Sequence, residues 1–117
     1  MYEHVLSPLQ IGPVEVKNRV VRTAHATGFV AGVANERVIA YHEARARGGV
    51  GLTILEIMGV HPSGPGSFMA FMPGVLDGHK QLMEVLGQYD MKVFQQLFHA
   101  GHSTSPLDGS EIGRAHV

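Results

Sequence analysis

The sequence predicts an α/β fold in which parallel strands alternate with helices. Residues 50–58 form an apolar segment with one inserted Glu, which is typical of a parallel strand buried on both faces of a sheet. Residues 92–99 are predicted to form a further strand. Residues 36–47 and 78–89 carry helical patterns, and a short turn leads from each helix into the next strand. With a first strand at residues 20–26, the order is strand, helix, strand, helix, strand. This order suits part of an open sheet or part of a barrel.

Composition narrows the class of protein. The chain has 117 residues, a net charge of −1 and no cysteine, so it forms one small domain without disulfides or cysteine metal sites. The near-neutral charge argues against binding to nucleic acid or an anionic membrane. The N-terminus lacks the pattern of a signal peptide, and no apolar segment is long enough to span a bilayer. We therefore expect a cytoplasmic protein.

The first strand predicts a place for a ligand. A short hairpin around Gly12-Pro13 precedes it, and the strand then ends in the small residues Thr23, Ala24 and Ala26. Small residues at the carboxyl end of a strand let a flat ligand approach the backbone, and ligands of α/β folds bind at this end. The same pattern also suits a core strand with a small-residue exit.

Residues typical of helix ends predict where the two helices begin and end, and therefore where the loops lie. Asn35 is the predicted N-cap of the helix 36–47, which Gly48-Gly49 ends. Asp77 is the predicted N-cap of the helix 78–89. The long loop 60–75 follows the second strand, and such loops carry function or form lids. The third strand leads into an exit loop at residues 100–106.

The C-terminal residues do not continue this pattern. Residues 111–117 resemble the conceptual translation of a sequencing adapter joined to an open reading frame. A genuine short polar C-terminus is the alternative. We therefore assign residues 1–110 to the first, incomplete part of a domain and residues 111–117 to a non-native tail. The chain is expected to be a fragment, because its last strand lacks the helix that should follow.

Four motifs, in order along the chain, resemble the old yellow enzyme family of NADH:flavin oxidoreductases. They are Leu9-Gln10-Ile11-Gly12 with Lys17-Asn18-Arg19, then Tyr41 with Arg45-Ala46-Arg47-Gly48-Gly49-Val50-Gly51-Leu52, then Leu55-Glu56, and last Gln96-Leu97-Phe98-His99-Ala100-Gly101. The segment 23–28 is more similar to the branch with trimethylamine dehydrogenase and dienoyl-CoA reductase. The resemblance implies a TIM (β/α)8 barrel, of which this chain supplies the N-terminal hairpin, the first three strands and two helices.

The same resemblance implies an FMN site at the carboxyl ends of the strands. The implied cofactor-binding residues are Thr23, Ala24, His25, Ala26, Ile57 and Gln96. The strand-one residues would contact the flavin through their backbone, and the Gln96 amide suits the pyrimidine edge because it offers a donor and an acceptor. Ile57 stands where the family usually has a small residue. Trimethylamine dehydrogenase has a flavin-bound cysteine at the position of Ala26, so FMN here would be non-covalent.

Two histidine positions leave alternatives open. Strand alternation points His25 away from Ala24 and Ala26, which puts it either behind the flavin-facing residues or in the core. His99 and His102 are three residues apart, and on a strand they would point to opposite faces. We therefore predict no metal site.

The function implied is an FMN-dependent NAD(P)H oxidoreductase that reduces an activated alkene or serves an amine demethylation. Its substrate would be a small molecule. In the family the substrate-binding pair, the catalytic tyrosine and the phosphate-binding arginines lie on later strands, so this fragment would be inactive alone. An iron–sulfur cluster and FAD would belong only to a longer parent, and a homo-oligomeric parent is one option. The alternatives are a non-catalytic small α/β binding or interaction module and a different phosphate-binding barrel.

Overall fold

The computed structural model describes residues 1–103, so the tail 111–117 and the later part of the exit loop lie outside the described residues. The chain opens with an antiparallel hairpin of β1 (Leu9–Ile11) and β2 (Val14–Val16). Residues 12 and 13 form its turn, which confirms the predicted hairpin.

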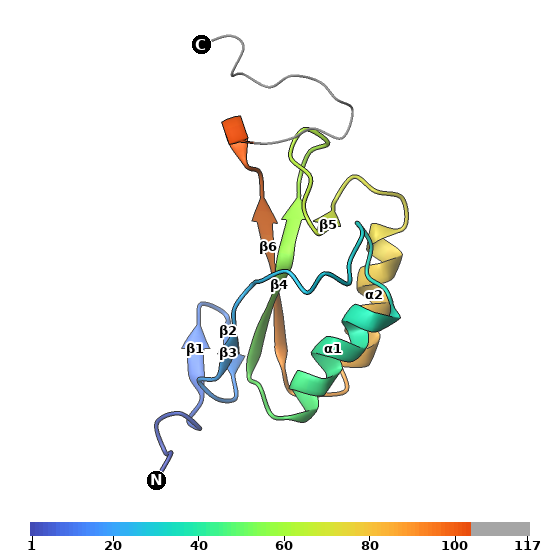
Figure 1. The fold of residues 1–117 in the computed structure, drawn as a ribbon. Helices are drawn as coiled ribbons and strands as arrows, with labels where there is room; N and C mark the ends of the chain where they lie inside the picture. The colour runs from blue at the N-terminus through green and yellow to red at the C-terminus, as the bar shows by residue number, and fades with distance from the viewer. Residues whose placement is uncertain (104–117) are drawn as a thin grey trace.

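A parallel sheet forms the centre of the molecule (Figure 1). Its long strands are β4 (Leu52–Gly59) and β6 (Lys92–Phe98), and β3 (Val21–Arg22) pairs with the start of β4 on the other side. The loop after β4 contains a short strand that the sequence did not predict, β5 (Phe68–Met69), which pairs with the end of β4. A 3₁₀ turn, η1 (Gly101–Ser103), follows β6.

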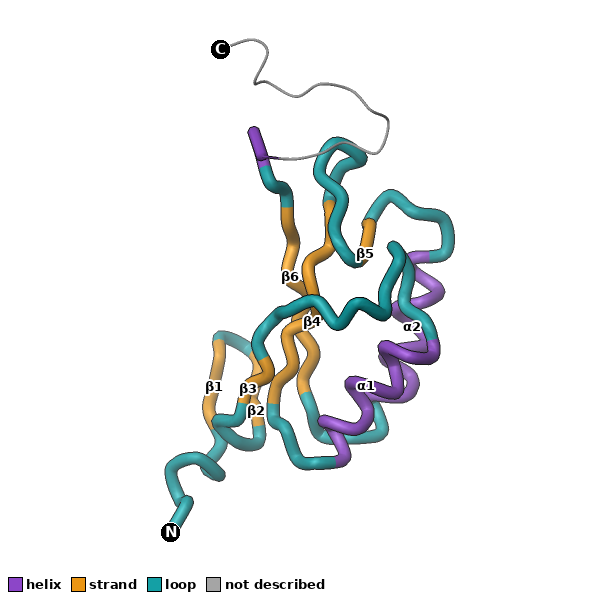
Figure 2. The backbone as a smooth tube through the Cα atoms, viewed as in Figure 1, coloured by secondary structure: helices purple, strands orange, loops and turns teal. Residues whose placement is uncertain are grey.

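Two helices cover one side of this sheet (Figures 1 and 2). The first, α1 (Glu36–Arg47), has the predicted bounds, and the Asn35 side chain accepts the Val38 N–H at 3.0 Å as its N-cap. The second helix is α2 (Val75–Leu86). The order β3, α1, β4, α2, β6 is the predicted alternation of strands and helices.

The predicted start of α2 is wrong by three residues. The helix begins at Val75 rather than Gly78, and its N-cap is Gly74, with φ of 83° and no side-chain cap. Glycine adopts this left-handed conformation without steric cost, so the chain turns into the helix here and Asp77 falls in the first turn. At the other end Gly87 stops the helix at Leu86, so Tyr89 lies beyond it.

The first strand is also shorter than predicted. Residues 20–26 were expected to form it, but only Val21 and Arg22 pair with β4. The Arg22 guanidinium donates to the carbonyl of Ile54 at 3.0 Å, so a side chain occupies an acceptor on β4 just beyond the last backbone pair. The segment after Arg22 therefore leaves the sheet as an extended exit.

Apolar side chains between the sheet and the two helices form the core. Its fully buried members include Val38 of α1, Leu55 of β4, Phe68 of β5 and Leu82 of α2. The ring of His79 on α2 packs edge-on against Phe68, with ring centroids 5.0 Å apart. The helix-facing side of the sheet is thus closed by packing.

One contact explains why two of the sequence motifs occur together. Asn18, from the first motif, donates to the carbonyl of Gly49 at 2.8 Å and accepts the Val20 N–H at 3.1 Å. A Cβ on Gly51, from the second motif, would collide with the Asn18 side chain. The glycine is needed because Asn18 ties the start of the first strand to the turn before β4.

Candidate functional site

A β-bulge shapes the carboxyl half of the sheet. Leu55 pairs with Gln95 and Met58 pairs with Leu97, so two residues of β4 lie opposite one residue of β6. The extra residue keeps both Leu55 and Met58 in the core beneath the helices. Glu56 and Ile57 occupy the bulge, directly across from Gln96.

Glu56 joins β4 to the exit of the first strand. Its carboxylate accepts the Thr27 N–H at 3.0 Å and the Thr27 hydroxyl at 2.8 Å. The Thr27 oxygen in turn accepts the Phe29 N–H at 3.2 Å. Glu56 is only 1% exposed, so these charge-assisted bonds lie where water does not compete.

The two neighbouring glutamines of β6 have different surroundings. The Gln95 side-chain oxygen accepts from His79 Nε2 of α2 at 3.0 Å, and its amide nitrogen donates to the Glu56 carbonyl at 2.7 Å. Because side chains alternate along a strand, Gln96 points to the face without helices, where it is exposed. Within residues 1–103 its amide group makes no hydrogen bond and is free to bind a ligand.

The exit of the first strand is held by side chains at both ends. Arg22 donates to the His25 carbonyl at 3.1 Å, and Thr27 bonds to Glu56. Between these anchors, the N–H groups of Ala24 and Ala26 have no hydrogen-bond partner in the part of the chain that the structure describes. The segment therefore presents unused backbone donors next to small side chains.

His25 lies at the surface rather than in the core, so the core alternative for this residue is wrong. Its Nδ1 lies 3.3 Å from the Thr23 carbonyl, which requires the proton on Nδ1. Its Nε2 then accepts from Arg22 at 3.4 Å and from the Tyr41 hydroxyl at 3.5 Å, both at the long limit for hydrogen bonds. These contacts join the strand exit to α1.

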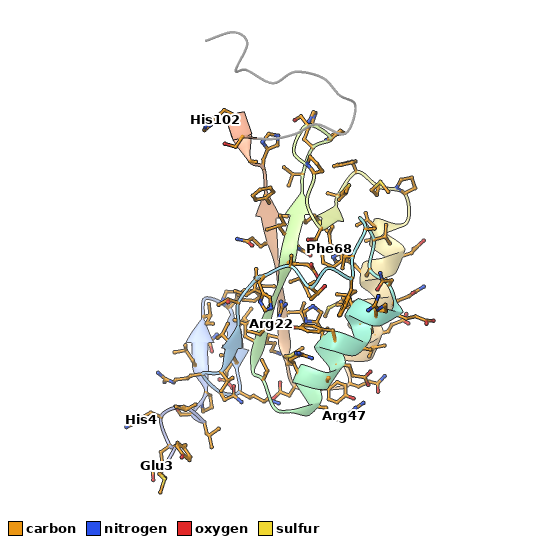
Figure 3. The ribbon with its side chains drawn as sticks, viewed as in Figure 1. Glu3, His4, Arg22, Arg47, Phe68 and His102 are labelled. Carbon is orange, nitrogen blue, oxygen red and sulfur yellow. The ribbon has the colours of Figure 1, made fainter. Side chains whose placement is uncertain are left out.

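A polar cluster lies between the strand exit and α1. The guanidinium of Arg22 (Figure 3) packs over the Tyr41 ring at 5.1 Å, and that of Arg45 packs over the same ring at 3.5 Å. His42 beside them is fully buried, and burial, with a smaller effect of Arg22, lowers its pKa to about 4. His42 is therefore neutral near pH 7, which avoids adding a further charge to the cluster.

A second polar group lies at the carboxyl end of β4 and β6. His99 Nδ1 accepts the Gly101 N–H at 2.9 Å, so its proton is on Nε2, which donates to the Ser63 hydroxyl at 2.9 Å. The hydroxyl then donates to His61 Nδ1 at 2.8 Å. These hydrogen bonds connect the loop after β4 to the end of β6, and they give His99 a structural role in the loop.

The structure brings together three of the six positions that were predicted to bind a cofactor. The pairs Thr27–Glu56 and Glu56–Gln95 are hydrogen bonded, and Ala26, Ile57 and Gln96 are the chain neighbours of these three residues. The residues that position them, Glu56 above all, were not assigned a role from the sequence. The signal was present, because one carboxylate interrupts an otherwise apolar strand.

Two hollows lie elsewhere on the molecule. One, of about 460 Å³, lies between the hairpin and the turn before β6, and its lining includes Glu15, Lys17 and Asp90. The other, of about 440 Å³, lies beside α2 and is lined mainly by apolar side chains, with His79 and Gln95. Neither lining includes any of the six predicted cofactor-binding residues. None of the helices within residues 1–103 is long and apolar enough to cross a membrane.

The chain is similar in sequence to parts of longer known proteins. The chain is 35% identical over 111 residues to an NADH oxidase of Thermoanaerobacter brockii, covering 90% of this chain and 17% of that protein. It is 29% identical over 113 residues to a metal reductase of Desulforamulus reducens, covering 90% of this chain and 16% of that protein. The chain thus spans about a sixth of the length of these relatives.

Solved structures show the same fold. A 2-naphthoyl-CoA reductase superposes with a TM-score of 0.79 at 27% identity, covering 89% of this chain and 17% of that chain. A morphinone reductase superposes with a TM-score of 0.80 at 23% identity, covering 91% and 30%. The predicted fold class, the first part of a TIM barrel, is confirmed. The model of the NADH:flavin oxidoreductase / NADH oxidase family matches residues 4–114, and the chain belongs to this family.

Proposed function

We propose that the protein containing this chain is an NAD(P)H-dependent flavoenzyme and that this chain supplies one wall of a non-covalent FMN site. The observation that carries the proposal is the set of unpaired polar groups on the segment after the first strand and on the neighbouring part of β6. It combines free backbone donors at Ala24 and Ala26 with a free amide at Gln96 on the open face of the sheet. FMN bound there would accept hydride from a reduced nicotinamide and deliver it to a small-molecule substrate.

The residues present fit a flat, polar ring system. Alanine side chains leave room for close approach to the backbone of residues 23–26, and N–H groups without partners stabilise ring acceptors. The Gln96 amide offers a donor and an acceptor on the same side chain, which matches a ring edge that carries both. Ala26 has no thiol, so it cannot form a covalent link. Ile57 would contact the ligand with its half-buried side chain.

The substrate class follows from the family. Reduction of an activated alkene by the reduced flavin is one reaction that we propose. In the second, an amine would instead give hydride to the flavin, and the iron–sulfur cluster of a longer parent would take up the electrons. Neither reaction uses a residue of this chain as acid or base. Those residues would come from later strands, so the chain alone would orient and tune the cofactor. An iron–sulfur cluster and FAD would belong to the longer parent. We also propose a cytoplasmic location.

The experiment uses the full-length protein. It is expected to purify with visible flavin absorbance that NADH or NADPH bleaches under anaerobic conditions. Gln96→Met should weaken FMN binding about tenfold, because one polar contact to the ring is lost and its partner is left unpaired. Gln81→Met, an exposed position on α2, is the matched control and should leave the affinity unchanged. A full-length protein without flavin, and without affinity for added FMN, contradicts the proposal.

A further inference from the structure

We propose that Glu56 is a positioning residue that sets the geometry of the strand exit against the cofactor. This inference rests on the proposed function for the identity of the ligand. Backbone pairing between β3 and β4 ends at Arg22, five residues before Thr27. The path of the segment between them therefore depends on side-chain contacts.

The Glu56 carboxylate is a two-point anchor for that segment. One oxygen accepts the Thr27 N–H and the other accepts the Thr27 hydroxyl, so both the position and the rotation of this residue are set. Both contacts are donors to Glu56, so the ionised carboxylate is the form that satisfies them. The Phe29 N–H bond to the Thr27 oxygen fixes the direction of the hydroxyl proton.

The backbone of Glu56 makes a second connection, to β6. Its carbonyl lies in the bulge and accepts the Gln95 amide at 2.7 Å. One residue of β4 thus bonds both to the segment after the first strand and to β6. Each residue in these bonds is the chain neighbour of a proposed flavin contact: Ala26, Ile57 or Gln96. A shift of Glu56 would change the spacing among these contacts without removing any of them.

The bulge is what allows this arrangement. Without the extra residue, strand alternation would turn either Leu55 or Met58 out of the core. With it, both stay beneath the helices while the Glu56 side chain reaches the strand exit. β-bulges often occur next to active sites, where they change the direction in which a side chain points.

The test compares Glu56→Gln, Thr27→Val and the double variant in the full-length holoprotein, with Thr27→Ser as the conservative variant. Gln has one acceptor oxygen where Glu has two, and Val lacks the hydroxyl. Each single change should weaken FMN binding by about tenfold to a hundredfold and alter the visible circular dichroism of bound flavin. Because both changes act on the same Glu56–Thr27 pair, the double variant should lose little more than either single variant. Thr27→Ser keeps both bonds and should retain the wild-type affinity and spectrum.

Glu84→Gln, at an exposed position of α2, is the matched control. Hydrogen exchange of a peptide covering residues 23–29, measured without FMN, tests the anchor independently of the ligand. Faster exchange in Glu56→Gln together with a changed flavin spectrum supports the inference. Unchanged affinity and spectrum overturn it, even where exchange is faster. A wild-type protein that binds no FMN refutes the proposed function and the flavin role of Glu56, while the exchange measurement still decides whether Glu56 anchors Thr27.

Discussion

The two sides of the central strand β4 are held in different ways. On the helix side, residues such as Leu55, Phe68 and Leu82 pack into one continuous apolar core. On the side of the strand exit, the segment 23–27 is held by a few polar contacts from Arg22 and Glu56. Both regions are next to the same strand, so the difference comes from the side chains and not from the sheet.

This comparison shows how the fold separates stability from positioning. Apolar burial is non-directional, so many arrangements of similar volume would stabilise the helix layer. A buried carboxylate that bonds two donors is directional, and loss of either donor leaves an unsatisfied group. The helix layer therefore keeps the sheet folded, while the strand exit determines where a ligand could lie.

The largest expected effect on the free energy of unfolding comes from a substitution on the helix side of β4. Phe68→Ala should lower the free energy of unfolding by about 3–5 kcal/mol, because it leaves a cavity at a fully buried position. Chemical denaturation measures this change. Leu76→Ala, whose side chain is 66% exposed, is the control and should change the free energy by less than about 0.5 kcal/mol. Equal effects at the two positions would mean that the helix layer is not the main source of stability.

An effect of intermediate size on stability is expected at His42, which lies where the two regions meet. Its pKa in the folded protein is about 4, below the unfolded value of 6.5, so between these values only the unfolded chain binds the proton. Stability should therefore fall as the pH is lowered from about 6.5 toward 4, by up to about 3 kcal/mol. Melting temperatures across this range measure the slope.

His42→Gln should flatten that slope, since glutamine does not titrate. His4→Gln, at an exposed position, should retain it. If the slope of the His42→Gln protein matches that of the wild type, other groups cause the acid sensitivity.

The smallest expected effect is at the N-cap of α1. Asn35→Ala should destabilise the protein by about 1 kcal/mol through loss of the cap to Val38. Asn35 also donates to the Phe29 carbonyl at 2.6 Å, a bond that leads back to the strand exit. Asn35→Asp keeps the cap and loses this donor, so comparing the two variants by thermal unfolding separates the contributions. Identical melting temperatures for wild type and Asn35→Ala would exclude a capping role.

Much of the fold could be predicted because its signals are local. The turn at Gly12-Pro13 and the cap at Asn35 specify the hairpin and the start of α1 through residues close in sequence. The order of strands and helices follows from apolar periodicity. The start of α2 was misplaced because Asp77 and Gly74 both carry end signals, and the left-handed turn at Gly74 decided between them.

The sequence by itself determined the α/β class and the family. The motifs that establish these are contiguous, and each reflects a local requirement such as a turn, a cap or a buried strand. Only the tertiary structure decided that the first strand stops at Arg22, that β4 contains a bulge, and that Glu56 bonds Thr27. These contacts join residues about thirty to forty positions apart, and their geometry depends on how the packed strands align.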